Sequence, residues 1–206
     1  MEKQFDVIVA GGGPAGIAAA VSAARCGANT ALIERYGILG GMMTSGAVHP
    51  ILGNTAPNTM YQEVCALLNE GHENVPKDTT RNGSEIHVDP EEAKYRLLKL
   101  VCDSGVKLYL QTPIADVCKD GNRVTGVTVV TQDGLVTLNA KCVVDSTGDG
   151  FVAYRAGAEY HVGRESDGRC QPLSTEFTLE NVDEARAITC WGGSDPVTMP
   201  DGKKFS

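Results

Sequence analysis

Basic residues are scarce in this sequence. Its 206 residues include 18 lysines and arginines against 26 aspartates and glutamates, which gives a formal net charge of −8. A surface with this balance repels polyphosphates, and no run of basic residues marks a groove for a nucleic-acid backbone. The composition therefore argues against an RNA or DNA partner.

Paired cysteines are missing. The seven cysteines are an odd number, are widely spaced and include no CxxC pair. This pattern favours reduced thiols, acting mostly as small packing residues, in a cytoplasmic protein. A disulfide framework or a zinc site is not expected, and no metal is predicted.

Long apolar runs are missing too. The N-terminal MEKQFDVIVAGGG has a short apolar run that Asp6 interrupts, so we predict no export signal there. The uncharged stretch YGILGGMMTSGAVHPILG, residues 36–53, holds five glycines, His49 and Pro50, which suit a membrane-spanning helix poorly. No membrane partner is expected.

Glycine, in contrast, is abundant. The 24 glycines fall in clusters without a repeat, as is typical of tight turns or of backbone pressed against a ligand. The first cluster lies in a predicted βαβ unit, with a strand over residues 5–10, a helix over 14–26 and a strand over 29–34. In the helix, Gly16, Ala20 and Ala24 leave one face almost without side chains, so that it can lie close to a sheet.

A dinucleotide-binding pattern occupies the first turn of this unit. Gly11, Gly13 and Gly16 form GxGxxG: the first permits the sharp turn, the second lets a pyrophosphate approach, and the third lets helix and strand pack. The helix N-terminus offers free N–H groups to that pyrophosphate. Glu34, at the end of the second strand, suits ribose hydroxyls and repels a 2′-phosphate, which favours FAD or NAD over NADP.

Further elements follow with clear boundaries. Asp89 caps a predicted helix that begins at Pro90 and ends near Gly105. We also predict a helix over 59–70, strands over 85–88 and 106–110, and an antiparallel meander divided by turns at 120 and 133. A separate core strand is expected over 141–145, then a short helix toward Gly157; residues 174–182 are a weaker strand candidate.

These segments resemble FAD-dependent oxidoreductases of the two-dinucleotide-binding-domain type, related to the glutathione reductase fold. The similarity runs from about residue 5 to residue 182. It rests on FDVIVAGGGPAGIAAAVSAARCGANTALIER, LGGMMTSG, DPEEAKYRLLKLVCDSGVKLYLQTPI, the meander, VVDSTGDG and GRESDGRCQP. A Rossmann domain that binds only NAD would instead continue into further βα units.

The resemblance implies a set of cofactor-binding residues along the chain. They are Gly11, Gly13, Pro14, Ala15 and Gly16 at the pyrophosphate, Glu34 and Arg35 around the adenosine ribose, Gly40, Gly41, Met42 and Thr44 toward the isoalloxazine, Ile114 at the adenine, and Thr147, Gly148 and Asp149 near the returning strand.

Simpler roles compete with several of these. Ile114 fits a core strand residue equally well, Arg35 fits a solvated charge, and Thr147 and Asp149 fit caps of the helix that follows Gly150.

The sequence offers two candidates for catalytic residues. His49 could transfer a proton or orient a substrate, although a histidine beside proline also suits a simple turn. Arg164 could hold a substrate carboxylate with its bidentate fork, and an ordinary ion pair is the alternative.

The sequence thus predicts an α/β, Rossmann-like FAD-binding domain with a parallel sheet, an antiparallel meander and a partial second region. The FAD-binding part comprises residues 1–49 and 90–158, and the partial substrate or cap region comprises 50–89 and 159–206. The expected activity is hydride or electron transfer between FAD and an unidentified small organic substrate.

Family members usually continue further and cover the flavin with their C-terminal part, so a missing C-terminal segment or a second chain is an expected partner. Two alternatives stay open: a non-catalytic FAD- or NAD-binding module that needs such a partner, and a flavoprotein of tRNA modification, which the acidic charge disfavours.

Overall fold

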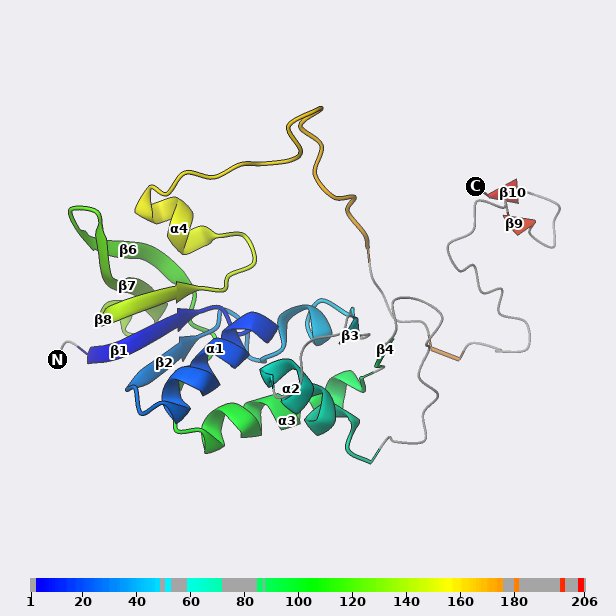
Figure 1. Ribbon diagram of the computed structural model, residues 1–206, viewed down its shortest axis with the longest axis horizontal. Coiled ribbons are helices and arrows are strands. Elements are labelled where there is room, and N and C mark those ends of the chain that lie inside the picture. The colour runs from blue at the N-terminus through cyan, green and yellow to red at the C-terminus, as the bar shows by residue number, and fades with distance from the viewer. Residues whose placement is uncertain are drawn as a thin grey trace. The chain divides into compact units, whose positions relative to one another are not determined.

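The computed structural model describes residues 3–48, 51–52, 59–71, 85–86, 88–175, 180–181, 197–198 and 204–205. The chain divides into two compact units, residues 1–176 and 177–206. In the second unit the described residues include one antiparallel ribbon, β9 (Val197–Thr198) paired with β10 (Lys204–Phe205). All other elements belong to the first unit (Figure 1).

Six strands of the first unit form one sheet in the order β5-β2-β1-β8-β7-β6. Its parallel part consists of β5 (Lys107–Tyr109), β2 (Thr30–Ile33), β1 (Lys3–Ala10) and β8 (Gly134–Asp145). Beyond β8 the sheet continues antiparallel through β7 (Arg123–Thr131) and β6 (Ile114–Asp120). The predicted α/β fold with a parallel sheet and a meander is therefore confirmed.

The meander and the returning core strand are one continuous strand, whereas the sequence suggested two. The first half of β8 pairs with β7, from Thr131 opposite Gly134 to Gly126 opposite Asn139. Its second half runs beside β1 until Asp145 lies opposite Ala10. The division at residue 141 was wrong because β8 changes partners along its length without interrupting its extended backbone.

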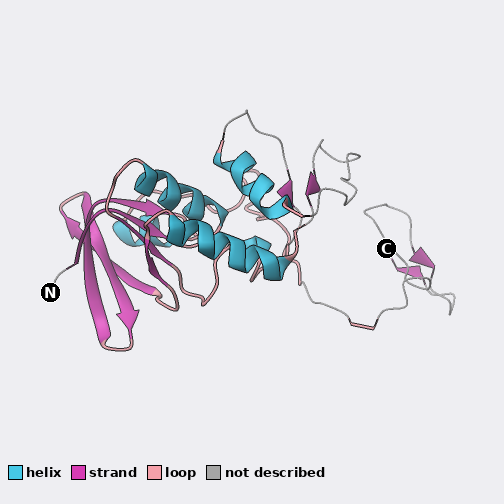
Figure 2. Cartoon of the chain, turned by 90° about the horizontal axis from the view of Figure 1, so that it is seen from below, coloured by secondary structure: helices cyan, strands magenta, loops and turns pink. Residues whose placement is uncertain are grey.

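Helices cover one face of the parallel strands. α1 (Pro14–Arg25) and α3 (Pro90–Asp103) lie along this face, and α2 (Met60–Asn69) packs on α3 (Figures 1 and 2). The core between helices and sheet contains Val9, Ile17, Val21, Leu32, Leu39, Met43, Leu68, Leu97 and Val101, among others.

The opposite face of the sheet is covered by the meander. Successive side chains of a strand point to opposite faces, so Ile8, Ala31 and Ile33 point away from the helices. They form a second buried cluster with Val127 and others from β7 and β8. Because both faces are covered, all four residues of β2 are buried, as expected for a central parallel strand.

The N-terminus of α3 has the predicted cap. One carboxylate oxygen of Asp89 accepts hydrogen bonds from the N–H groups of Glu91 (2.8 Å) and Glu92 (3.0 Å), and Pro90 follows the cap. These bonds satisfy two of the donors that a helix start leaves free.

Side-chain contacts hold α2 against its neighbours. Glu63 receives two hydrogen bonds from Arg25 of α1, at 2.6 and 2.7 Å. Arg96 of α3 donates to the carbonyl oxygens of Leu67 and Glu70 near the end of α2. The helix is thereby fixed to both α1 and α3.

The remaining elements of the first unit are short. β3 (Ile51–Leu52) pairs with β4 (Glu85–Ile86), and α4 (Phe151–Ala156) follows β8 and ends at Gly157. The strand predicted over 174–182 lies largely outside the described residues. Among the described helices none combines the length and apolarity needed to cross a bilayer.

Candidate cofactor site

The glycine turn between β1 and α1 is tightly packed at two of its positions. Gly11 has a φ of 98°, and a Cβ added there would lie 2.4 Å from the carbonyl oxygen of Ser146. A Cβ at Gly16 would lie 1.8 Å from the carbonyl oxygen of Gly11. Only glycine at both positions allows strand, turn and helix to approach this closely.

Gly13, the second glycine of the pattern, has space around it. A Cβ at Gly13 would meet no described atom within 4 Å, and no described side chain caps the N-terminus of α1, where Gly13 is the N-cap. The first N–H groups of a helix lack partners within the helix and carry the positive end of its dipole. Pro14 and Ala15, both exposed, begin the helix beside this open turn. The turn therefore combines free donors with room for an anionic group.

Glu34 lies buried beside the turn, with 7% of its surface exposed. One carboxylate oxygen accepts a hydrogen bond from the N–H of Gly12 (2.6 Å), and the other accepts from the N–H of Tyr36 (2.8 Å). A carboxylate can accept about four hydrogen bonds, so these two contacts leave acceptor capacity for ligand hydroxyls. Glu34 thus both fixes the turn and offers a polar edge beside it.

Arg35 follows on the exposed side of the loop. Its guanidinium carbon lies 4.7 Å from the centre of the Tyr36 ring, a cation–π contact. This contact is consistent with Arg35 being a surface charge, which is the alternative to a contact with the adenosine ribose.

The next segment folds back onto the glycine turn. The N–H of Gly40 donates to the carbonyl oxygen of Gly12 (2.9 Å), and a Cβ at Gly41 would lie 3.0 Å from Cα of Gly13. Gly40 has a φ of 109° and precedes η1 (Gly41–Met43). The structure therefore brings Gly40 beside Gly12 and Gly41 beside Gly13, and contact of either residue with a cofactor stays a prediction.

Met42 and Thr44 have different environments within this segment. Met42 is 58% exposed, whereas Thr44 is buried and its hydroxyl donates to the carbonyl oxygen of Leu39 (2.6 Å). The Thr44 hydroxyl thus stabilises the loop itself. Met42 is free to contact a ligand at the surface.

The loop after β8 forms the other side of the turn. The N–H of Ser146 donates to the carbonyl oxygen of Ala10 (2.8 Å), which places this loop against Gly11. Gly148 and Gly150 adopt the left-handed conformation, with φ of 83° and 65°. Gly148 and Asp149 are exposed. The predicted residues at 147–149 therefore lie on the edge of the sheet that carries the glycine turn.

Asp145 organises this loop, a role that the sequence reasoning missed. Its carboxylate accepts hydrogen bonds from the Thr147 hydroxyl (2.7 Å), the Thr147 N–H (3.1 Å) and the Ala153 N–H (2.8 Å). Burial alone would raise the pKa of Asp145, but hydrogen bonds from Ala153, Thr147 and Val152 outweigh it and lower the pKa below its usual value. The sequence does contain a signal for this role, because Asp145 is an acid that ends a core strand and directly precedes Ser146 and Thr147.

Thr147 also caps the short helix. Its hydroxyl accepts a hydrogen bond from the Phe151 N–H (2.9 Å) while donating to Asp145. This capping contact is the simpler of the two roles considered for Thr147. Ile114 likewise occupies a structural position, because it begins β6 opposite Val129 and packs partly buried against the second core cluster.

The structure describes one of the two catalytic candidates. His49 lies outside the described residues. Arg164 forms a bidentate ion pair with Asp167, with both hydrogen bonds at 2.7 Å, and its guanidinium lowers the pKa of that carboxyl. The fork that could hold a substrate carboxylate therefore already holds an internal one. No cluster of three or more potential metal ligands occurs among the described residues.

Several known proteins are similar to this chain. A family model described as FAD dependent oxidoreductase matches residues 6–203. The tRNA uridine 5-carboxymethylaminomethyl modification enzyme of Aquifex aeolicus is 33% identical over 185 residues, covering 83% of this chain and 29% of that protein. Thiamine thiazole synthase of Methanothermobacter thermautotrophicus is 30% identical over 183 residues, covering 82% of this chain and 66% of that protein. The chain thus spans between 29% and 66% of the length of these two relatives.

Solved structures support the fold. A geranylgeranyl bacteriochlorophyll reductase-like protein from Thermoplasma acidophilum superposes with a TM-score of 0.56 at 20% identity, over 77% of this chain and 43% of that one. L-proline dehydrogenase from P. horikoshii gives 0.53 at 15% identity, over 79% and 58%. Because the family model matches nearly the whole sequence, the chain belongs to the FAD-dependent oxidoreductase family, whose cofactor is FAD.

Proposed function

We propose that the chain forms the FAD-binding part of an enzyme that transfers a hydride or electrons between an organic substrate and flavin. One observation carries this proposal: the open glycine turn, Glu34 and the loop after Asp145 meet at the carboxyl ends of β1, β2 and β8. Ligands of open α/β sheets bind at this edge.

The residues present fit the adenosine and pyrophosphate half of FAD. The free space at Gly13 and the N-terminus of α1 suit two phosphates, which the helix N–H groups would bind. The remaining acceptor capacity of Glu34 suits the ribose hydroxyls, and its negative charge disfavours a 2′-phosphate. Together these features support FAD at this edge and oppose NADP.

Two loops would guide the other half of the cofactor. Gly40, Gly41 and Met42 form one wall beside Gly13, and residues 147–149 form the second. FAD, when bound, supplies the site that accepts or donates the hydride. The chain's own contribution is to bind and orient, and His49 and Arg164 stay proposals for proton transfer and for substrate carboxylate binding.

The relatives leave the substrate open. A tRNA-modifying enzyme and a thiazole synthase match largely the same portion of this chain. Similarity over this portion therefore does not distinguish between their substrates. Their names still favour an enzyme over a non-catalytic module. A C-terminal segment or a second chain that completes the substrate site stays part of the proposal.

A visible absorption spectrum tests the cofactor directly. The spectrum is recorded on the purified protein and again after FAD has been added and the excess removed by gel filtration. The second sample is expected to show flavin absorption bands that correspond to about one FAD per chain. Bleaching of these bands by candidate reductants or substrates would support the enzyme, and bound flavin that no compound reduces would favour a binding module. Protein that takes up no FAD would contradict the proposal.

A further inference from the structure

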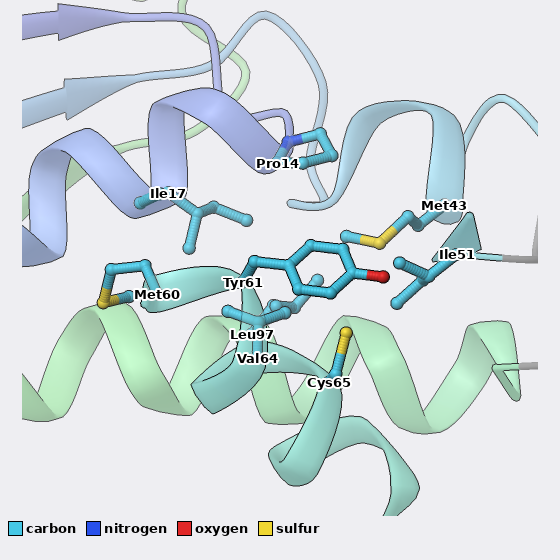
Figure 3. A pocket seen from close by; sticks show the side chains of 10 residues that line it. Pro14, Ile17, Met43, Ile51, Met60, Tyr61, Val64, Cys65 and Leu97 are labelled. Carbon is cyan, nitrogen blue, oxygen red and sulfur yellow. The ribbon is translucent and has the colours of Figure 1, made fainter. Parts of the chain in front are cut away.

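Polar groups are unevenly placed around the glycine turn. An apolar groove lies between α1, α2 and α3, and Pro14, Ile17 and Met43 belong to its lining (Figure 3). The lining residues that the structure describes include none with a charge, so the groove offers a nucleoside few hydrogen-bond partners. Polar groups lie instead where the chain leaves β2 and β5, the neighbouring strands at one edge of the sheet.

The segments that follow β2 and β5 continue side by side. The N–H of Thr112 donates to the carbonyl oxygen of Glu34, and the N–H of Gln111 donates to that of Tyr36, both at 2.9 Å. Gln111 therefore lies next to the loop that begins with Glu34, the predicted ribose acceptor. Its side chain lies along Gly37, because a Cβ built on that glycine would be 3.4 Å from the Gln111 amide nitrogen.

Gln111 has an unusual backbone conformation. Its φ is 50°, in the left-handed region that glycine, asparagine and aspartate adopt more readily than other residues. Among the described residues other than glycine, only Ala47 and Asn181 share a positive φ. Residues held in this way cost free energy and cluster at ligand-binding sites. Glutamine is thus strained at a position where glycine would not be, which favours a binding role for its side chain.

The side chain of Gln111 is free to bind a ligand. It is exposed, and its amide forms no hydrogen bond within the part of the chain that the structure describes. A glutamine amide presents a donor and an acceptor side by side, which together match N7 and the N6 amino group of adenine. Hypoxanthine fits this pair less well, because an oxygen replaces the amino donor.

We propose that Gln111 is a specificity-determining residue that hydrogen-bonds the adenine base of the dinucleotide. The inference rests on the proposed FAD site, because it places the base beside the residue that would hold the ribose. It adds a side-chain contact that selects the base, whereas Glu34 selects the sugar.

FAD and flavin hypoxanthine dinucleotide test this contact. Titrations followed by flavin fluorescence give both Kd values, and the wild-type protein should bind FAD about tenfold more tightly, within the range of one bidentate pair with adenine. Gln111→Ala should bind the two compounds equally. Gln132→Ala removes the same side chain from an exposed turn between β7 and β8 and should keep the wild-type preference.

Gln111→Gly separates a binding role from a structural one. Glycine adopts a φ of 50° without strain, so this variant should unfold at the same urea concentration as the wild-type protein or at a higher one. It should nevertheless lose the preference for adenine. A side chain that only stabilises the loop would give the reverse result, a less stable variant with an unchanged preference.

Three results would overturn the proposal: equal wild-type Kd values for the two flavin dinucleotides, an unchanged preference in Gln111→Ala, or loss of the preference in Gln132→Ala. Wild-type protein that takes up neither flavin contradicts the proposed FAD site instead. The Kd values for ADP and IDP, measured by calorimetry, then decide on Gln111 by itself. About tenfold tighter binding of ADP supports its role, and equal binding or none rejects it.

Discussion

Two carboxylates fix the loops of the candidate site. Glu34 ends β2 and accepts from the N–H groups of Gly12 and Tyr36, while Asp145 ends β8 and accepts from Thr147 and Ala153. Hydrogen bonds to an ionised acceptor are stronger than those between neutral groups. Each acid therefore holds a turn at the edge of the sheet where the cofactor is proposed to bind.

Glu34→Ala should weaken FAD binding about 10- to 100-fold, because contacts to a charged acceptor contribute roughly 1.5–3 kcal/mol. The variant loses the predicted ribose acceptor and the bond that fixes Gly12. Titration of flavin fluorescence measures the Kd. Glu91→Ala, an exposed acid in α3, is the control and should leave the Kd unchanged; equal Kd values for wild type and Glu34→Ala would show that the ribose contact is misplaced.

Asp145→Asn should lower the free energy of unfolding at neutral pH by about 1 kcal/mol, because the amide nitrogen cannot accept the hydrogen bonds that one carboxylate oxygen accepts. The folded-state pKa of Asp145 is lowered, so its contribution is complete above the ordinary carboxyl pKa and disappears as the pH falls through the folded-state value.

Urea unfolding as a function of pH measures this effect. The difference between wild type and Asp145→Asn should be constant above about pH 4 and shrink below it. Asp133→Asn changes an exposed turn residue and should show a smaller difference. A difference that grows on acidification would have the wrong sign.

At the level of the elements, close approach of backbones shapes the sheet. Gly126 lies opposite Asn139 at the point where β8 passes from β7 to β1, and a Cβ added there would lie 2.2 Å from the carbonyl oxygen of Leu138. Glycine within a strand often marks such an approach. The meander can therefore fold over the second core cluster only with a minimal residue at this position.

Gly126→Ala should reduce the free energy of unfolding by about 1–3 kcal/mol, the usual range for overpacking of a buried position. Urea denaturation of the two proteins gives the value. Gly37→Ala is the matched control, since its Cβ would meet only the Gln111 side chain at 3.4 Å and its φ is not positive. If both variants lose the same free energy, the close contact at Gly126 is not responsible.

On the scale of the whole molecule, charge bears on the choice of partner. The net charge of −8 disfavours polyanions, yet one relative acts on tRNA according to its name. The alignment with that enzyme spans 29% of its length, and most of the same part of this chain also matches thiamine thiazole synthase. The net charge therefore argues against a tRNA partner, a question on which the shared segment gives no information.

We expect no stable complex between this chain and tRNA at about 0.15 M salt, where nucleic-acid binding depends on neutralising phosphates with Lys and Arg. An electrophoretic mobility shift with mixed tRNA checks this expectation, and a basic protein of similar size serves as the positive control. A complex that persists at this salt would favour the tRNA-modification alternative.

Local patterns predicted much of the fold, and the residues that they assigned to the cofactor stay predictions. The strand and helix around Gly11 and the cap at Asp89 follow from residue spacing and turn chemistry, which act over a few residues. The continuity of β8 could not be predicted in the same way, because its two halves pair with strands from distant parts of the chain.

The sequence by itself determined that this chain forms a βαβ unit with a glycine-rich first turn and an acid at the end of its second strand, since glycine spacing and a strand-terminal glutamate are local properties. Only the tertiary structure decided that Asp145 holds the second loop, that Asp167 engages Arg164, and that an apolar groove lies beside the turn. The groove depends on how helices from separate parts of the chain pack together. The contacts of Asp145 and Asp167 are local in the sequence, but they depend on loop geometry that residue spacing alone does not fix.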